Sequence, residues 1–562
     1  MIELKLKKIF FFIVYIIIIL VLIILFEIIL RVFNYGIDTR VFIKVGKKEK
    51  YFTDNVYFVN KYYPGIDNKI ISLNSNLFKV EKDDHTLRGF VLGGSSAQGY
   101  PYNVNHSFGK ITEKLINKSS NDKRKLEIIN ISHTSMSSYY VNDVAKKLLK
   151  YKPDFLIIYS GHNEYYGSIN SLNGKYVSKK IYLFLKEYKV IQLLMKLLNI
   201  EKSIDMGNQT LMENLYNKTT ILPEDKKNEY INHCYNMNIQ NIFDFYERKN
   251  VKIIIIEPIS NIIDMPPFKG KGDEELNQEI EKYINVIKEN NVKGMKKIID
   301  EDGERYEKEN SNIMYLKAVM NKKLNNNNIE NFKMAKDYDL IPFRAKSKLI
   351  IGLDELIKEN MKFNNNLVSI NLEKNLLMFA NEEIFSNIIF SDHLHFNFKG
   401  NLLVSYYLAL ELSKMFSLNI NYKLLEKDYD DPDFYYYDLF FSDINELQAF
   451  QNIKILLDSL LFKNMVIGYY NNSLVNQENK FIKEKEMTSY IKDYGLKVYE
   501  TLFDYYLSKE KYKDAEYMLN SLNFIIPYNK YVNEKLLSLY KLTKENEKAE
   551  DIKNKLNNFF EK

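Results

Sequence analysis

Five short apolar runs recur through the middle of the chain, separated by stretches with helical spacing. The runs are residues 89–92, 126–131, 155–159, 252–256 and 367–370. Each is continuous and rich in β-branched residues, as expected for strands buried on both faces of a parallel sheet. Between them, apolar residues recur at helical spacing, as Phe108, Ile111 and Leu115 do. The alternation predicts an α/β domain whose parallel sheet is sandwiched between helices in three layers, α/β/α.

A longer apolar run lies near the N-terminus. Residues 9–26 are all apolar, and after Glu27 the run resumes over residues 28–30. At about 1.5 Å per residue, a helix of this length spans a hydrocarbon core of roughly 30 Å. Lysines precede the run and favour a cytoplasmic start, although basic residues also follow it (Lys5, Lys7 and Lys8 before; Arg31, Arg40, Lys44, Lys47 and Lys48 after). Since no small-residue cleavage site follows, we interpret the run as an uncleaved transmembrane anchor in the cell membrane, with the rest of the chain on the periplasmic side.

Changes in composition divide the chain into four parts. They are the cytoplasmic tip and anchor (1–33), a polar and aromatic linker (34–84), the α/β domain (85–420) and a helical C-terminal region (421–562). Two insertions interrupt the α/β domain. Residues 172–245 have a helical pattern and are expected to cap a site, and residues 270–335 are expected to form a charged, partly helical surface insertion.

The C-terminal region carries a weak internal repeat. Ala515 and Ala549 occupy similar sequence contexts thirty-four positions apart. This is the period of tetratricopeptide helix pairs, so we predict a tetratricopeptide-like, all-helical region.

Composition narrows the classes of function. A net charge of +6 over 562 residues is small, and acidic and basic residues are mixed throughout. No basic stripe of the kind that binds nucleic acid is visible, so we expect no nucleic-acid partner. The single cysteine, Cys234, rules out an intramolecular disulfide and is expected to be a buried small residue. The acidic residues at 428–433 lack the glycine turn and terminal glutamate of a calcium loop, so a solvated turn is expected there.

Polar residues stand where the predicted strands end and where one helix begins. Ser95 follows the first strand in a Gly-Gly-Ser turn, Gly161 and Asn163 follow the third, and Asp392 and His395 precede an apolar helix. Because sites form at the carboxyl ends of parallel strands, Ser95 and Asn163 are expected to meet. A serine hydroxyl needs a base to become a nucleophile. His395 is the expected base, Asp392 would orient its imidazole, and Asn163 with backbone N–H groups would stabilise an oxyanion.

These segments resemble the four sequence blocks of SGNH hydrolases, the GDSL esterase superfamily. Gly93-Gly94-Ser95 is similar to the first block, residues 161–164 to the third and residues 392–400 to the fourth. In the second block, residues 130–135, Ser135 stands where the family usually has glycine, and its backbone N–H remains a donor. The resemblance covers about residues 85–415 and implies a flavodoxin-like fold without metal or cofactor. It also implies a catalytic triad and a group that stabilises the oxyanion and binds substrate. The triad would be Ser95, His395 and Asp392, and the second group would be Asn163, Ser135 and Gly161.

Further segments resemble a membrane-anchored bacterial subgroup with helical-repeat tails. Residues 257–267 and 339–345 are expected to line the pocket, and Asp339 with Arg344 is expected to form a structural ion pair. Ser96 is a competing nucleophile that the turn alignment disfavours. His393 and His395 could be interpreted as a metal pair, but the sequence offers no third ligand arrangement for zinc.

We therefore expect a membrane-anchored serine esterase outside the cytoplasm, acting on small O-acyl esters, such as acetate, of surface or cell-wall glycans. Two alternatives stay open. The same site would transfer the acyl group to a sugar hydroxyl if water were excluded from the acyl-enzyme. In the other alternative, the hydrolase domain is structural, and the chain is an assembly factor whose helical tail binds a partner protein.

Overall fold

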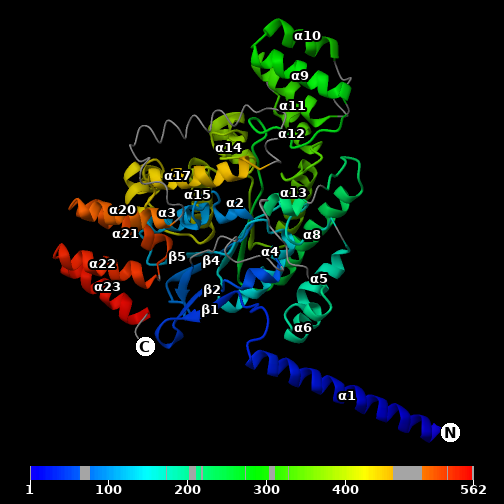
Figure 1. Cartoon of the computed structure of the whole chain (residues 1–562), viewed down its shortest axis with the longest axis vertical. Helices are drawn as coiled ribbons and strands as arrows, with labels where there is room; N and C mark the ends of the chain where they lie inside the picture. Colours follow the sequence, from blue (N-terminus) through cyan, green and yellow to red (C-terminus); the bar gives the residue numbers. More distant parts are fainter. Residues whose placement is uncertain are drawn as a thin grey trace.

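The computed structural model describes residues 2–63, 76–172, 174–200, 211–216, 219–272, 274–302, 310–326, 328–459, 496–527 and 529–559. Within these ranges the chain forms an α/β domain, a long N-terminal helix that projects from it, and a helical C-terminal region (Figure 1). The mixed α/β class and the helical C-terminal region agree with the pattern of apolar residues.

Among the described residues, five parallel strands form the central sheet in the order β5-β4-β6-β7-β8. They are β4 (Thr86–Gly93), β5 (Lys125–Asn130), β6 (Phe155–Tyr159), β7 (Lys252–Ile256) and β8 (Leu367–Ile370). Each overlaps one of the five apolar runs, so the predicted strands are confirmed. Both faces of the sheet are buried: on β4, Val91 packs into one core while Phe90 and Leu92 pack into the other.

Helices cover both faces of this sheet. On one face α3 (Phe108–Ser119) packs against α15 (Phe398–Met415). On the other face α4 (Ser138–Leu148) packs against α8 (Lys227–Tyr246), which in turn contacts α13 (Ser347–Met361). The apolar stripe of α3, which includes Ile111 and Leu115, is fully buried. With both faces covered, the loops at the strands' carboxyl ends are left to build a site.

Residues 34–63 and 76–84, expected to be a linker, pack onto the α/β domain. They contain a three-stranded antiparallel sheet of β1 (Phe42–Val45), β2 (Tyr51–Asp54) and β3 (Leu77–Lys79). Phe42 and Phe78 meet edge to face at 4.9 Å and join the same core as Phe90. Strands of three or four residues are too short to show an alternating pattern, which is why the sequence did not indicate them.

The described part of the first insertion is helical, as expected, and its helices meet different parts of the molecule. Its helices are α5 (Tyr176–Leu185), α6 (Lys189–Leu197), α7 (Leu211–Tyr216) and α8, and residues 173, 201–210 and 217–218 lie outside the described part. α8 belongs to the helices that cover the sheet, and α6 packs against the N-terminal helix. On α7, Tyr216 contacts Tyr166 edge to face at 5.6 Å, close to the candidate site described below.

The second insertion is also helical, with α9 (Glu274–Lys288), α10 (Val292–Asp302), α11 (Ser311–Lys323) and α12 (Ile329–Asp337). α9, α10 and α11 share a small core of their own that includes Tyr283, Met295 and Leu316. Figure 1 shows α9 and α10 standing out from the rest of the molecule. Of the asparagine run at 325–328, Asn327 lies outside the described residues.

The C-terminal region begins with α16 (Tyr422–Tyr429) and α17 (Asp443–Leu457). After residues 460–495, which lie outside the described part, α20 (Lys497–Ser508) pairs with α21 (Tyr512–Ile525), and α22 (Lys530–Leu542) pairs with α23 (Asn546–Phe559). Ala515 is fully buried in their shared core. The acidic segment is less solvated than expected, because Asp428 is buried and pairs with Lys118 at 3.5 Å.

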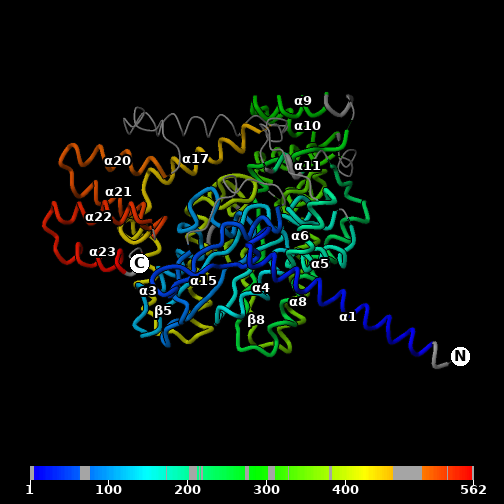
Figure 2. The backbone as a smooth tube through the Cα atoms, turned by 60° about the horizontal axis from the view of Figure 1, so that its bottom comes forward, coloured from blue at the N-terminus to red at the C-terminus, as the bar shows by residue number. Residues whose placement is uncertain are grey.

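The N-terminal helix, α1 (Ile2–Val32), projects from the domain in both views (Figures 1 and 2). Its segment Lys5–Val32 is long and apolar enough to cross a membrane, and none of its most apolar window is buried in the protein. Its length and composition are those of a membrane anchor or a signal sequence.

Candidate active site

Ser95 stands at the junction between a strand and a short helix. β4 ends at Gly93, and α2 (Ser95–Gln98) begins two residues later. A β-carbon on Gly93 would lie 2.1 Å from the carbonyl oxygen of Tyr159, and one on Gly94 would lie 2.4 Å from the side-chain nitrogen of Asn163. The two glycines are therefore needed for close packing between this turn and the end of β6.

His395 and Asp392 share a tight loop directly before α15. The loop is closed by an isolated β-bridge between Phe390 and Phe396, whose rings stack at 5.2 Å. Asp392 Oδ1 accepts the backbone N–H groups of Leu394 at 2.9 Å and His395 at 2.8 Å. These two backbone bonds hold the carboxylate beside the imidazole, independently of the bond between the two side chains.

The three side chains form one continuous hydrogen-bonded chain. Ser95 Oγ lies 2.6 Å from His395 Nε2, and His395 Nδ1 lies 2.6 Å from Asp392 Oδ2. Because a carboxylate only accepts, Nδ1 carries the proton and Nε2 is left to accept from the serine hydroxyl. Burial by itself would raise the pKa of Asp392, but the adjacent imidazoles of His395 and His393 hold this pKa well below its usual range. The carboxylate therefore remains charged and keeps the imidazole in the tautomer that can take a proton from Ser95.

Ser96, the competing nucleophile, is engaged elsewhere. Its hydroxyl donates to the carbonyl oxygen of Leu394 at 3.0 Å. The imidazole of His395 faces Ser95, so of these two serines Ser95 is the one whose hydroxyl contacts the histidine base.

Asn163 lies against the same turn. Its side-chain amide donates to the carbonyl oxygen of Met136 at 3.0 Å and sits beside Gly94. An amide nitrogen has two hydrogens, so this bond leaves one to offer to a substrate. Asn163 thus connects the end of β6 with the segment after β5, on the two sides of the strand that carries Ser95.

Ser135 and Gly161 occupy unusual backbone conformations. Ser135 has φ of 56°, the left-handed region that glycine adopts without strain, and its carbonyl oxygen accepts the N–H of Ser168 at 2.9 Å. Gly161 has φ of 132°, and the side chains nearest to it are those of Pro258, Leu349 and Ala345. A glycine is suited to this position because the turn that leads to Asn163 needs a positive φ there.

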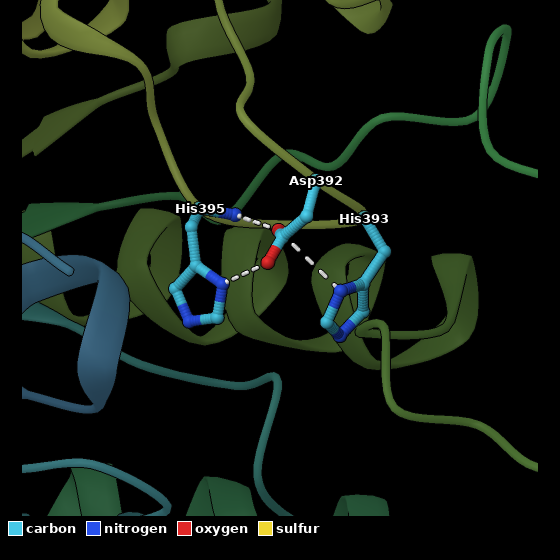
Figure 3. A group of neighbouring side chains, drawn as sticks. All are labelled: Asp392, His393 and His395. Atoms are coloured by element: carbon cyan, nitrogen blue, oxygen red, sulfur yellow. Dashed lines mark hydrogen bonds and ion pairs between the residues drawn. The ribbon is translucent and has the colours of Figure 1, made fainter. Parts of the chain in front are cut away.

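A second histidine lies on the same carboxylate. His393 Nδ1 is 3.4 Å from Asp392 Oδ1, on the side opposite His395 (Figure 3). Ligand atoms of Asp392, His393 and His395 lie within 4.8 Å of one another. The expectation that no third ligand accompanies the two histidines is therefore wrong, because Asp392 is placed as one. However, both hydrogen-bonding positions of the His395 ring are already occupied by Ser95 and Asp392. The arrangement therefore suits proton transfer better than metal binding.

The segments expected to line the pocket do border the loop that carries the triad base. The N–H of Asn261 donates to the carbonyl oxygen of His393 at 3.0 Å, and the ring of Phe343 meets that of His393 edge to face at 6.4 Å. The N–H of Ala345 also donates to Nδ1 of His162, on the turn after β6, at 3.1 Å. Asp339 and Arg344 are both buried and 3.5 Å apart. Arg344 also donates to three backbone carbonyl groups and Asp339 accepts three backbone N–H groups, so this pair is structural (Asn261, Met265 and Pro266; Phe268, Lys269 and Ile341).

An apolar wall, which the sequence did not reveal, stands beside the triad. The ring of Tyr100 packs on the imidazole of His395 at 4.7 Å. Behind Tyr100, an apolar cluster joins aromatic residues of the α/β domain to residues of α17. The aromatic residues are Tyr165, Tyr166, Phe268 and Phe343, and the α17 residues are Ile453, Leu456 and Leu457. The Tyr100 hydroxyl donates to the carbonyl oxygen of Asn452 at 2.8 Å, and the Asn452 amide donates to that of Pro101 at 2.8 Å. We call this set the α17 wall; no local motif connects its distant parts.

Comparison with known protein families finds no matching family, and comparison with curated proteins finds no match.

Proposed function

We propose that the protein is a serine esterase of the SGNH type, with the three-layer flavodoxin-like fold that this implies. One observation carries the proposal: the Ser95–His395–Asp392 chain, with both hydrogen bonds at 2.6 Å, lies at the carboxyl ends of a parallel sheet. The sequence blocks around these residues support the same assignment. A serine with a purely structural role does not require an imidazole beside its hydroxyl, nor a buried carboxylate that orients this imidazole.

The mechanism follows from the geometry. His395 Nε2 takes the hydroxyl proton of Ser95 while Ser95 Oγ attacks the ester carbonyl carbon, and Asp392 stabilises the imidazolium that forms. The free hydrogen of the Asn163 amide and the backbone N–H groups of Ser95 and Ser135 stabilise the oxyanion. His395 then protonates the leaving alcohol. Water, activated by the same imidazole, hydrolyses the acyl-enzyme and releases Ser95.

We further propose that α1 anchors this domain in the cell membrane with the site on the periplasmic side. The apolar length of α1 and its lack of burial support an anchor. Esters within reach of such a site include O-acylated surface or cell-wall glycans, and small acyl groups such as acetate fit the crowded surroundings of Ser95, which is 7% exposed. Neither metal nor cofactor takes part in this mechanism.

Transfer of the acyl group to a glycan hydroxyl is the second candidate reaction. Its support is the low exposure of both reacting groups, since His395 is only 6% exposed and exclusion of water favours an alcohol acceptor. Incubating the protein with an activated acetyl ester, with and without a glycan acceptor, separates the two. Free acetate in both cases indicates an esterase, and acetylated glycan indicates a transferase.

Labelling of the full-length protein in detergent with a fluorophosphonate probe tests the proposal. Wild-type protein should be labelled, Ser95→Ala should not be labelled, and labelling of His395→Ala should be sharply reduced because the hydroxyl loses its base. Absence of labelling in folded wild-type protein would favour the alternative of an assembly factor that acts through its helical tail.

A further inference from the structure

α6 is fastened to the end of α1. The Glu27 carboxylate accepts the backbone N–H groups of Lys189 at 3.0 Å and Val190 at 2.8 Å, at the N-terminus of α6. No side chain within α6 caps this terminus, so Glu27 satisfies N–H groups that the helix leaves free. Arg31 pairs with Glu27 at 2.6 Å and donates to the carbonyl oxygen of Glu187 at 2.9 Å.

The residues that follow α1 strengthen this attachment. The N–H of Ile37 donates to the side-chain oxygen of Gln192 at 2.8 Å, and Lys189 Nζ donates to the carbonyl oxygen of Ile37 at 2.5 Å. Polar contacts therefore join α6 to both sides of the point where the chain leaves α1. Figures 1 and 2 both place α5 and α6 beside this end of α1. The direction of α1 consequently determines where α5 and α6 lie.

The outer faces of α5 and α6 are apolar. The large apolar side chains exposed there include Ile181 (51%), Phe184 (60%), Tyr188 (39%), Leu194 (46%), Leu197 (68%) and Leu198 (68%). We call this set the α5–α6 patch. Tyr188 precedes α6, and its ring contacts that of Phe184 at 5.5 Å, which joins the two helix faces. A surface helix in water normally presents polar residues outward, so neighbouring apolar faces of this kind indicate an interaction surface.

We propose that the α5–α6 patch lies in the interface of the same bilayer that α1 spans. The polar Glu27 interrupts the apolar run of α1 near its end, at the depth where a helix leaves the hydrocarbon. Because Glu27 binds the start of α6, α6 is held at that depth. Apolar side chains there enter the acyl boundary, while exposed Lys175 and Lys196 reach lipid headgroups. The patch therefore gives the domain a second membrane contact, which restricts its tilt about α1 and sets the direction in which the site faces.

The inference rests on the proposed membrane position of α1 and is independent of the esterase chemistry. It is tested with the full-length chain in phosphatidylethanolamine–phosphatidylglycerol vesicles, in a Cys234→Ala background. A polarity-sensitive fluorophore is attached at Leu197→Cys or Phe184→Cys. Ile17→Cys, within α1, is the positive control. Met378→Cys is the matched negative control, because Met378 is 84% exposed and lies on α14 (Leu372–Ala380), a helix well away from α5 and α6 in Figure 1.

In one set of vesicles the lipids carry a nitroxide quencher near the headgroup, and in a second set they carry it deep in the acyl chain. The headgroup quencher should quench the labels at 197 and 184, the acyl-chain quencher should quench the label at 17, and both should leave the label at 378 bright. Quenching at 17 combined with bright labels at 197 and 184 would overturn the patch inference while leaving the anchor intact. Bright labels at all positions would refute the anchor as well. An emission shift at 197 that depends on protein density, without quenching by lipid, would identify a second copy of the chain as the occupant and would also overturn the inference.

Discussion

The candidate site has two sides that are built in different ways. On the polar side, Ser95, His395 and Asp392 are held by short directional bonds, and each belongs to a turn whose local sequence explains it. On the other side, the α17 wall brings together Tyr100, Phe343 and Ile453, which are separated by hundreds of residues and joined by apolar packing. In the proposed mechanism the first side provides the chemistry, and the second shapes the space next to it.

The difference shows how function and specificity can be divided within one site. Replacing a member of the polar side should change the rate of the chemical step. Replacing a member of the wall should change which substrates bind and how tightly. Variants on each side, each with a control nearby, can therefore test whether the two sides affect different kinetic parameters.

The largest of these effects is expected on the polar side, for Asp392→Asn. An amide in this place would hold the imidazole in the wrong tautomer, and we expect ester turnover to fall by about 10⁴-fold. The measurement is kcat with a p-nitrophenyl ester. Asp431→Asn, in the acidic segment of the C-terminal region, is the control and should retain full activity. A small loss in Asp392→Asn would show that the carboxylate does not orient the base.

Asn163→Ala comes next. Loss of one oxyanion donor should lower kcat by roughly 10²- to 10³-fold with little change in KM, because the contact strengthens only as charge develops. Asn170→Ala, which removes a turn-stabilising side chain outside the triad, is the control. A change in KM alone would show that Asn163 contributes to binding of the substrate in its ground state rather than to stabilisation of the oxyanion.

On the wall, Ile453→Ala should act through binding. We expect KM for a p-nitrophenyl ester to rise roughly fivefold, as expected when about 1 kcal/mol of apolar contact is lost, with a smaller change in kcat. Ile455→Ala on the same helix is the matched control, because Ile455 is 61% exposed whereas Ile453 is 3% exposed. Equal effects of the two substitutions would show that the wall does not reach the substrate.

The last effect is on stability rather than on turnover, and it depends on pH. Burial lowers the pKa of His162 from 6.5 to about 3. The unfolded chain therefore binds more protons between these values, and the stability contributed by neutral His162 is lost as pH falls below 6.5. His162→Asn keeps an acceptor for the Ala345 N–H but does not titrate. Its loss of unfolding free energy between pH 6.5 and pH 5 should be smaller than that of wild type by up to about 2 kcal/mol. Urea unfolding at the two pH values measures this, and identical losses would contradict it.

The same contrast explains what could be predicted from the sequence. The five strands were evident because a strand buried on both faces must be continuously apolar, as β6 is. The meeting of Ser95, His395 and Asp392 could be expected because each lies in a short motif beside a strand or helix end. Side-chain geometry then added what no motif contains, such as the hydroxyl of Ser96 donating to Leu394.

Contacts between distant segments could not be predicted in this way. The helical pattern of residues 172–245 was correct, but helical spacing does not tell which surface a helix meets. α8 meets α4, whereas α6 meets α1. Tyr100 follows Ser95 by five residues, yet nothing local indicates that its ring packs on His395 and its hydroxyl bonds to α17.

The most direct test of the central claim is to locate the serine that reacts. Full-length protein would be treated with a fluorophosphonate, digested, and analysed by mass spectrometry of the peptide that contains Ser95 and Ser96, with Ser96→Ala as a control. The account predicts an adduct on Ser95 in both wild type and Ser96→Ala. An adduct on Ser96, or an unmodified peptide from folded protein, would contradict it.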